Sequence, residues 1–177
     1  MGIAKLYLFV LFSLSTPLAL FECWGITHFR IAWGQPLPQD TFWGKQIVVK
    51  VPWNAVDVRL ATRYHAFTFL VLFPVLLTTA SLFFKRWVAN PPQGWPAWTL
   101  FIVACVAGNM VLEDFLYFVF STIFGKPYPH AVSRLLRGEA NWHPRHLDLG
   151  YFKLPDFYVY LPFAIAILLV AVWWLSR

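Results

Sequence analysis

The sequence predicts an all-α integral membrane protein, a four-transmembrane-helix bundle with two long loops capping one face. Of its 177 residues, 59% are hydrophobic and only 12% are charged, whereas soluble domains carry about 25% charged residues. A water-soluble protein of this composition would lack polar surface, so the chain is expected to face lipid. The ten tryptophans support this interpretation, because amphipathic rings are favoured at both membrane interfaces.

Four apolar segments of a single membrane domain, residues 1–177, are expected to form the spans. They are residues 6–24, 66–84, 97–124 and 157–175. A bilayer needs roughly 17–25 residues per helix. The first segment is also typical of a signal peptide, but no small-residue cleavage site follows it, so a retained anchor is expected. Pro74 should kink the second span, because proline removes a backbone hydrogen bond.

The connections between the spans are unequal in length. Residues 85–96 form a short link, and residues 22–65 and 125–156 form the two long loops. Alternate crossings place both long loops on one face and both termini on the other, with five tryptophans at each face. The distribution of Lys and Arg leaves the orientation open, and the density of charge favours cytoplasmic termini. Within the loops, residues 45–51 predict a strand and residues 130–139 a short amphipathic helix.

Two consecutive acids, Glu113 and Asp114, lie inside the third apolar segment. Carboxylates at membrane depth are costly and usually face the protein interior, paired, protonated or bound to a cation. Asn109, Glu113 and Tyr117 are spaced four apart and should share one helix face. Asp114 lies about 100° further round, so it should meet a different partner. We therefore expect a catalytic stripe of Asn109, Glu113 and Tyr117, joined by Asp114, near the long-loop face.

All five histidines fall on the long-loop side of the four-span arrangement. His143 and His146 are three residues apart, and on a helical turn they could ligate one ion together. With His130 and Glu113 they could form a metal site with an open position, for a divalent transition metal such as Zn or Fe. A structural interpretation stays open beside it: Glu113 or Asp114 could pair with a loop arginine and only fasten the loops. The candidate arginines are Arg59, Arg63 and Arg145.

Residues 111–118 (VLEDFLYF) resemble the Pro-x-Glu-Glu-x-x-Phe-Phe helix of membrane lycopene cyclases. The resemblance covers eight residues; the proline is absent, and Asp114 stands at the second glutamate. In that family the acid pair lies in a span and is thought to serve proton-driven ring closure. The resemblance implies a lipidic substrate and a proton-transfer role for Glu113 and Asp114.

The leading functional hypothesis is a small polytopic membrane enzyme that acts on a lipidic or isoprenoid-like substrate. The chemistry would be acid/base or metal-assisted, at the intramembrane Glu–Asp pair. The alternatives are a non-catalytic subunit of a larger membrane complex and an ion- or proton-coupled transporter. Expected partners are membrane lipids, a lipidic substrate, and a second copy or other subunits. Nucleic acid is not expected despite the net charge of +6, because the basic residues are scattered beside apolar spans.

Overall fold

The computed structural model describes residues 2–28, 46–50, 57–62, 67–84, 91–125, 129–139 and 145–177. In this part of the chain the protein is mostly helical. Three helices are long and apolar enough to cross a membrane: residues Ile3–Cys23 of α1 (Ile3–His28), all of α4 (Gly94–Phe124) and all of α6 (Phe157–Leu175). The chain is therefore a membrane protein of helical architecture, as its composition predicted, and α6 occupies the range predicted for the fourth span.

The segment predicted as the second span forms two shorter pieces, a π-helical turn, η1 (Thr68–Leu72), and the helix α3 (Phe73–Phe84). Its apolar stretch, Leu70–Thr79, is shorter than the other three. The widened turn directly precedes Pro74, which has no N–H to donate to the preceding turn. After it, the Thr78 hydroxyl donates a hydrogen bond of 2.7 Å to the Pro74 carbonyl. The proline thus perturbs the helix where the sequence indicated.

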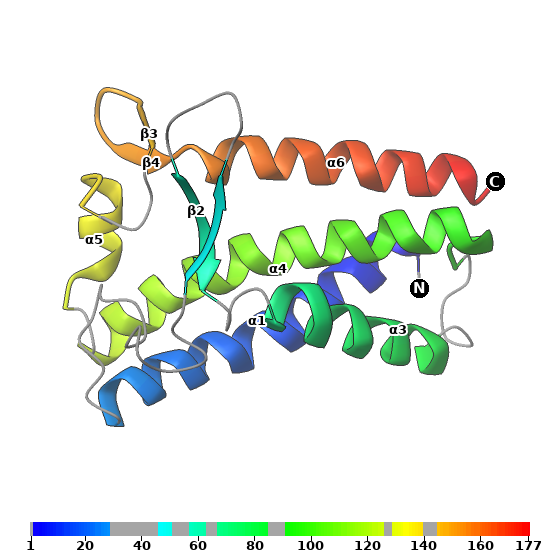
Figure 1. Ribbon diagram of the computed structural model, residues 1–177, viewed down its shortest axis with the longest axis horizontal. Helices are drawn as coiled ribbons and strands as arrows, with labels where there is room; N and C mark the ends of the chain where they lie inside the picture. Colours follow the sequence, from blue (N-terminus) through cyan, green and yellow to red (C-terminus); the bar gives the residue numbers. More distant parts are fainter. Residues whose placement is uncertain are drawn as a thin grey trace.

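The helix α4 is the centre of the assembly, with α1 and α6 packed against it (Figure 1). The contacts between α1 and α4 follow the same order along both helices: Ser15 contacts Asn109, and Cys23, eight residues later, contacts Tyr117, eight residues after Asn109. The two helices are therefore parallel. In contrast, α6 is antiparallel to α4, since Tyr158 near its start meets Asp114, and Ser176 after its end meets Gln93. Both chain termini consequently lie at the same end of the helices (Figure 1).

Tight packing joins α1 to α4 at Gly108, which is buried beneath α1. A Cβ added at Gly108 would lie 2.7 Å from Leu11 Cδ2 and would also collide with the Tyr7 hydroxyl. Small residues permit such close approach between helices in membranes. The core extends from this contact through Phe101 and Cys105 to residues of α6.

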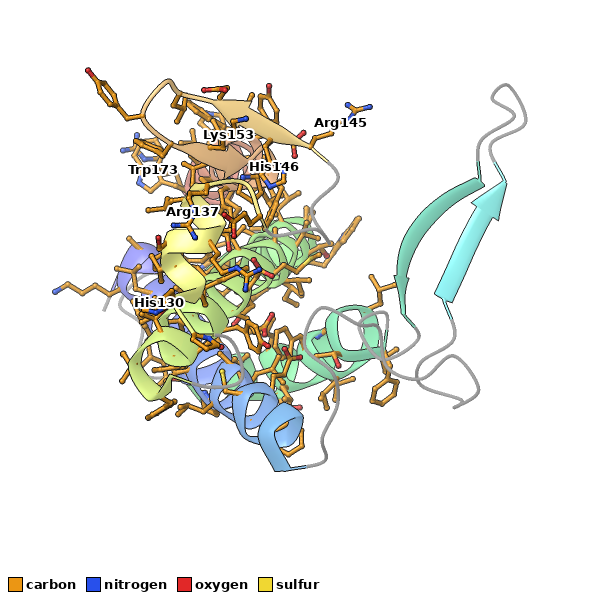
Figure 2. All side chains as sticks on the ribbon, turned by 90° about the vertical axis from the view of Figure 1, so that its left-hand side faces the viewer. His130, Arg137, Arg145, His146, Lys153 and Trp173 are labelled. Carbon is orange, nitrogen blue, oxygen red and sulfur yellow. The ribbon has the colours of Figure 1, made fainter. Side chains whose placement is uncertain are left out.

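In the described residues, four short strands form two separate antiparallel hairpins. The first pairs β1 (Gln46–Lys50) with β2 (Asp57–Thr62); β1 confirms the predicted strand, whereas β2 was not predicted. Figure 2 shows this hairpin standing to one side of the helices. The rest of the loop at 22–65 lies outside the described residues, so its capping role stays a prediction.

The second hairpin and a short helix lie at the end of the helices opposite the termini (Figure 1). They are α5 (Ala131–Leu136), which confirms the predicted amphipathic helix, and the strands β3 (His146–Asp148) and β4 (Lys153–Pro155). Ala131 and Leu135 are buried against Phe118 of α4. Only Asp156 separates β4 from α6, so this hairpin is tied closely to the start of that helix.

Candidate site at a cluster of carboxyl groups

The predicted polar stripe of α4 faces α1 and is buried. The exposed fraction is 0% for Asn109, 6% for Glu113 and 7% for Tyr117. Ser121, one helical repeat further on, extends the stripe and is 0% exposed. The four-residue spacing therefore identified a real interface between helices. Its members have different roles within it.

Asn109 fastens α1 to α4. Its Oδ1 accepts a hydrogen bond of 2.6 Å from the Ser15 hydroxyl. Its Nδ2 donates one of 2.8 Å to the Cys105 carbonyl within α4. Both ends of the amide are thus engaged in contacts that hold the two helices in register, as interhelical hydrogen bonds do in membrane bundles.

The C-terminal part of the stripe, Tyr117 and Ser121, is also a packing contact between α4 and α1. The Cys23 thiol donates to the Tyr117 carbonyl at 3.6 Å and lies 3.5 Å from the Ser121 hydroxyl. The Tyr117 ring packs edge-on against Phe118. Tyr117, predicted as a site residue, therefore contributes to the same α1–α4 interface, one turn beyond Glu113.

Glu113 meets a second carboxyl group, that of Glu22 on α1. The two side chains are within hydrogen-bonding reach of each other. The other oxygen of Glu113, Oε1, is buried and has no hydrogen-bond partner within the described part of the chain. Two carboxylates have only acceptor atoms, so a hydrogen bond between them requires a proton on one of them.

Asp114 points to the other side of α4, where it meets α6. The Tyr158 hydroxyl donates a hydrogen bond to Asp114 Oδ2, and the Tyr158 ring packs edge-on against Phe115. The two consecutive acids thus have different partners on different helices, as their angular separation of about 100° predicted.

These groups lie at one level along the helices. Glu22 is the next-to-last residue of the apolar stretch of α1, Ile3–Cys23. Tyr158 is the second residue of α6. Glu113 and Asp114 lie beside these two positions, so the cluster sits where two of the three long apolar stretches end, toward α5 and the β3–β4 hairpin. The sequence predicted this proximity to the long-loop face.

The residues predicted to bind a metal are not gathered by the described part of the chain. His130 begins α5 with a left-handed backbone (φ 58°), and His146 lies on β3, apart from His130 in Figure 2. His146 Nε2 is buried without a partner among the described residues, and His143 lies outside them. No group of three His, Cys, Asp or Glu side chains suited to a metal occurs within the described ranges. A Zn or Fe ion stays a prediction.

The alternative pairing of these acids with arginine finds no support at Glu113 itself. The described groups that act electrostatically on its carboxyl group are Glu22, Asp114 and Cys23, none of which is a cation. Arg145 is exposed near β3 (Figure 2). Arg63 and the side chain of Arg59 lie outside what the structure describes.

Sequence reasoning missed two members of the cluster, Glu22 and Tyr158. A signal for Glu22 was present, because it is the one acid at the end of the first apolar segment. Its relation to Glu113 depends on the register between α1 and α4, which no local pattern encodes. Tyr158 is one of several aromatic residues at the start of the last span, and only the packing of α6 selects it.

No protein-family model, curated protein or solved structure matches the chain. The chemistry must therefore be argued from the cluster itself. A carboxyl group positioned beside a bound molecule can donate a proton to it or accept one from it. The unpartnered oxygen of Glu113 gives such a molecule a point of contact.

Proposed function

We propose that this chain is a small polytopic membrane enzyme that acts on a lipidic substrate, including isoprenoid-like ones, by acid/base chemistry at the carboxyl cluster. One observation carries the proposal: the buried Glu113 carboxyl group lies close to the part-buried Glu22 carboxyl group of α1, and Glu113 Oε1 has no partner within the described residues. Intramembrane acids that are retained at such cost generally serve function. The acid/base route is favoured over the metal-assisted one, because the carboxyl groups gather without a described histidine.

In this mechanism the Glu22–Glu113 pair is the proton store. Two carboxyl groups at close range cannot both ionise easily, so one retains a proton that is available for transfer. Glu113 would contact the substrate through Oε1 and act as the general acid or base. Asp114, held by Tyr158, would present its carboxyl oxygens to positive charge developing on the substrate. The location at the end of the apolar stretches suits a substrate that arrives laterally from the bilayer.

The same proposal includes four membrane crossings. If α1 and α4 both cross the bilayer in the same direction, the chain between them must return an odd number of times. The helical segment η1–α3 lies between them in sequence and runs opposite to α4 (Figure 1). Residues 67–84 would extend roughly 27 Å at 1.5 Å per residue, close to the ~30 Å hydrocarbon core. We place the termini in the cytoplasm, as the charge density favours.

The test compares lipids in cells that express the wild type, Glu113→Gln or the control Glu139→Gln. Glu139 is an acid outside the cluster, at the end of α5. Mass spectrometry of total lipid extracts is expected to show a lipid species whose abundance changes when the wild type or the control is expressed. Expression of Glu113→Gln should leave that abundance unchanged. Equal lipid profiles for the wild type and a folded, membrane-inserted Glu113→Gln variant would overturn the proposal.

A second candidate is a proton-coupled transporter, since proton-sharing acids in membranes also form proton pathways. The observation that favours it is again the carboxyl pair of Glu22 and Glu113. Proteoliposomes with an internal pH dye distinguish the two. Proton flux abolished by Glu113→Gln, together with an unchanged lipid profile, would select transport over catalysis.

A further inference from the structure

The turn of the β3–β4 hairpin exposes three apolar side chains. Tyr151 is fully exposed, Leu149 is 48% exposed and Phe152 is 40% exposed. Together with Gly150 these residues, 149–152, are the hairpin tip. Neighbouring apolar side chains that are exposed together mark a surface that meets a partner or a membrane.

Hydrogen bonds hold the hairpin tip in a defined conformation. The Leu149 N–H donates a hydrogen bond of 2.9 Å to the Phe152 carbonyl, and the Gly150 N–H donates one of 2.9 Å to Asp148 Oδ1. Both donors are thus satisfied within the hairpin, which lowers the cost of moving them out of water. The exposure of the apolar side chains is therefore a property of a folded turn.

The hairpin is also fixed relative to the helices. Arg137, which follows α5, forms a β-bridge with Lys153 of β4, and a Cβ added at Gly138 would lie 3.2 Å from the Lys153 side chain. The helix α5 itself packs on α4. At the base of the hairpin, the Asp156 N–H donates a hydrogen bond of 3.2 Å to the Arg145 carbonyl. The tip is therefore held at one place beside the helices.

That place is close to the point where α6 begins. Only β4 and Asp156 lie between the tip and Phe157, the first residue of α6. Figures 1 and 2 both show the hairpin on the side of the molecule away from α1, and in Figure 1 its turn stands outward of α6. Tyr160 and Phe163, which are 61% and 69% exposed, continue an apolar surface along α6. On a membrane-spanning helix such a surface faces lipid, so the tip lies at the end of a lipid-facing surface.

The other end of α6 has aromatic residues of the kind found at membrane interfaces. Trp173 and Trp174 are exposed, and the Arg177 guanidinium lies 3.5 Å from the centre of the Trp173 ring. Tryptophan and tyrosine are enriched at both interfaces of a bilayer. The 19 residues of α6 extend roughly 28 Å, close to the ~30 Å hydrocarbon core. When the tryptophans lie at one interface, the hairpin tip therefore lies at the other.

We propose that the hairpin tip inserts Tyr151 and Phe152 into the headgroup layer of the bilayer and anchors the start of α6 there. The partner is the phospholipid of the surrounding membrane. Its interface accepts an aromatic ring on the acyl side while the tyrosine hydroxyl stays with the headgroups. With Trp173 and Trp174 at the far interface, α6 is held at both ends, and such anchors set the depth and tilt of a helix. The inference does not involve the carboxyl cluster, so it is tested independently of the proposed function.

The experiment uses the full chain, labelled with meta-fluorotyrosine, in nanodiscs of phosphatidylcholine. Fluorine NMR signals of the tip and of α6 are assigned with Tyr151→Phe and Tyr160→Phe, both at exposed positions. Phosphatidylcholine with a nitroxide on its headgroup should relax the Tyr151 signal more strongly than the Tyr160 signal. With the nitroxide near the end of an acyl chain the order should reverse, because Tyr160 lies further along α6 and therefore deeper.

A gadolinium chelate in the aqueous phase distinguishes the other possible surroundings of the tip. If the chelate relaxes the Tyr151 signal while neither lipid label does, the tip stands free in water and the inference is wrong. If the Tyr151 signal is sheltered from the chelate and from both lipid labels, a second copy of the chain or another subunit covers the tip, and the inference is again wrong.

A second variant tests the anchoring itself. Tyr151→Ser combined with Phe152→Ser removes both aromatic rings from the tip. Without this anchor α6 should change its depth or tilt, so the relaxation of the Tyr160 signal by the headgroup label should differ from that in the wild type. The control Glu139→Gln, at the same end of the molecule but outside the tip, should leave it unchanged. An equal Tyr160 response in the wild type and the double variant would show that the tip does not anchor α6.

Discussion

The two faces of α4 are built from different interactions. Toward α1, the interface contains a glycine, a buried hydroxyl–amide hydrogen bond and the Glu22–Glu113 pair. Toward α6, the contact is mainly aliphatic and aromatic, and its polar contacts lie at the two ends: Tyr158 with Asp114, and the Gln93 N–H with the Ser176 hydroxyl. In a bilayer, lipid tails are as apolar as the side chains, so close approach and polar contacts provide much of the specificity. The α1 face should therefore be the less tolerant of substitution.

The largest expected effect is that of Gly108→Val. The added side chain would meet Leu11 and the Tyr7 hydroxyl at impossible distances, so α1 must move away from α4. Overpacking of this kind costs typically about 1–3 kcal/mol, and here the upper end is expected. Thermal unfolding in nanodiscs measures it. The control Ala164→Val changes an exposed position on α6, and an equal loss in both variants would remove the contrast between the two faces.

Next in size is Ser15→Ala, which removes the donor to the buried Asn109 Oδ1. An unsatisfied buried acceptor costs about 1–3 kcal/mol. A double-mutant cycle with Asn109→Ala isolates the coupling between the two side chains. We expect the second substitution to cost little once the first is made. Independent, additive losses would show that this hydrogen bond does not hold α1.

On the α6 face, Tyr158→Phe removes the hydroxyl that donates to Asp114 while keeping the ring that packs on Phe115. A loss of about 1 kcal/mol is expected, the typical net contribution of one hydrogen bond to stability. Tyr160→Phe, at an exposed position of the same helix, should change nothing. If Tyr158→Phe costs more than Ser15→Ala, the ranking of the two faces is reversed.

The smallest effect concerns Glu139, outside both faces. Hydrogen bonds from Arg137 and then Arg134 lower the pKa of the Glu139 carboxyl group below its ordinary value. A lowered folded-state pKa contributes stability above the unfolded pKa, and that stability is lost as the pH falls through the folded pKa. The contribution is thus present at neutral pH and disappears only in acid. Carbon-13 NMR titration of Glu139 should show its pKa rising in Arg137→Gln; an unchanged pKa would contradict the assignment.

The sequence predicted the parts of this structure that depend on local composition. Residues 157–175 are apolar without interruption, and α6 occupies them; the four-residue spacing of Asn109, Glu113 and Tyr117 correctly placed them on one face. The partners on other helices could not be found in this way. Glu22 reaches Glu113 only because α1 and α4 are parallel and closely packed at Gly108.

The second span and the hairpins show the same limit. Hydropathy over 66–84 predicted one continuous helix, and the backbone is helical throughout 67–84, but hydropathy could not indicate the π-helical turn before Pro74. The β3–β4 strands are three residues each, too short for an alternating pattern to emerge. They are defined by pairing across the turn at Gly150, whose positive φ of 82° suits glycine.

The unequal lengths of α4 and α6 have a consequence for how the protein meets its bilayer. The 31 residues of α4 extend roughly 46 Å, whereas the 19 of α6 extend roughly 28 Å, which nearly matches the hydrocarbon thickness. Because α6 begins level with Asp114, about ten residues at the end of α4 extend beyond the start of α6. At a rise of 1.5 Å per residue they add some 15 Å. This part of α4 carries α5, which packs on Phe118. Because α1 also continues past Cys23 to His28, α4, α1 and α5 together build this end of the molecule, while α6 begins only at its base.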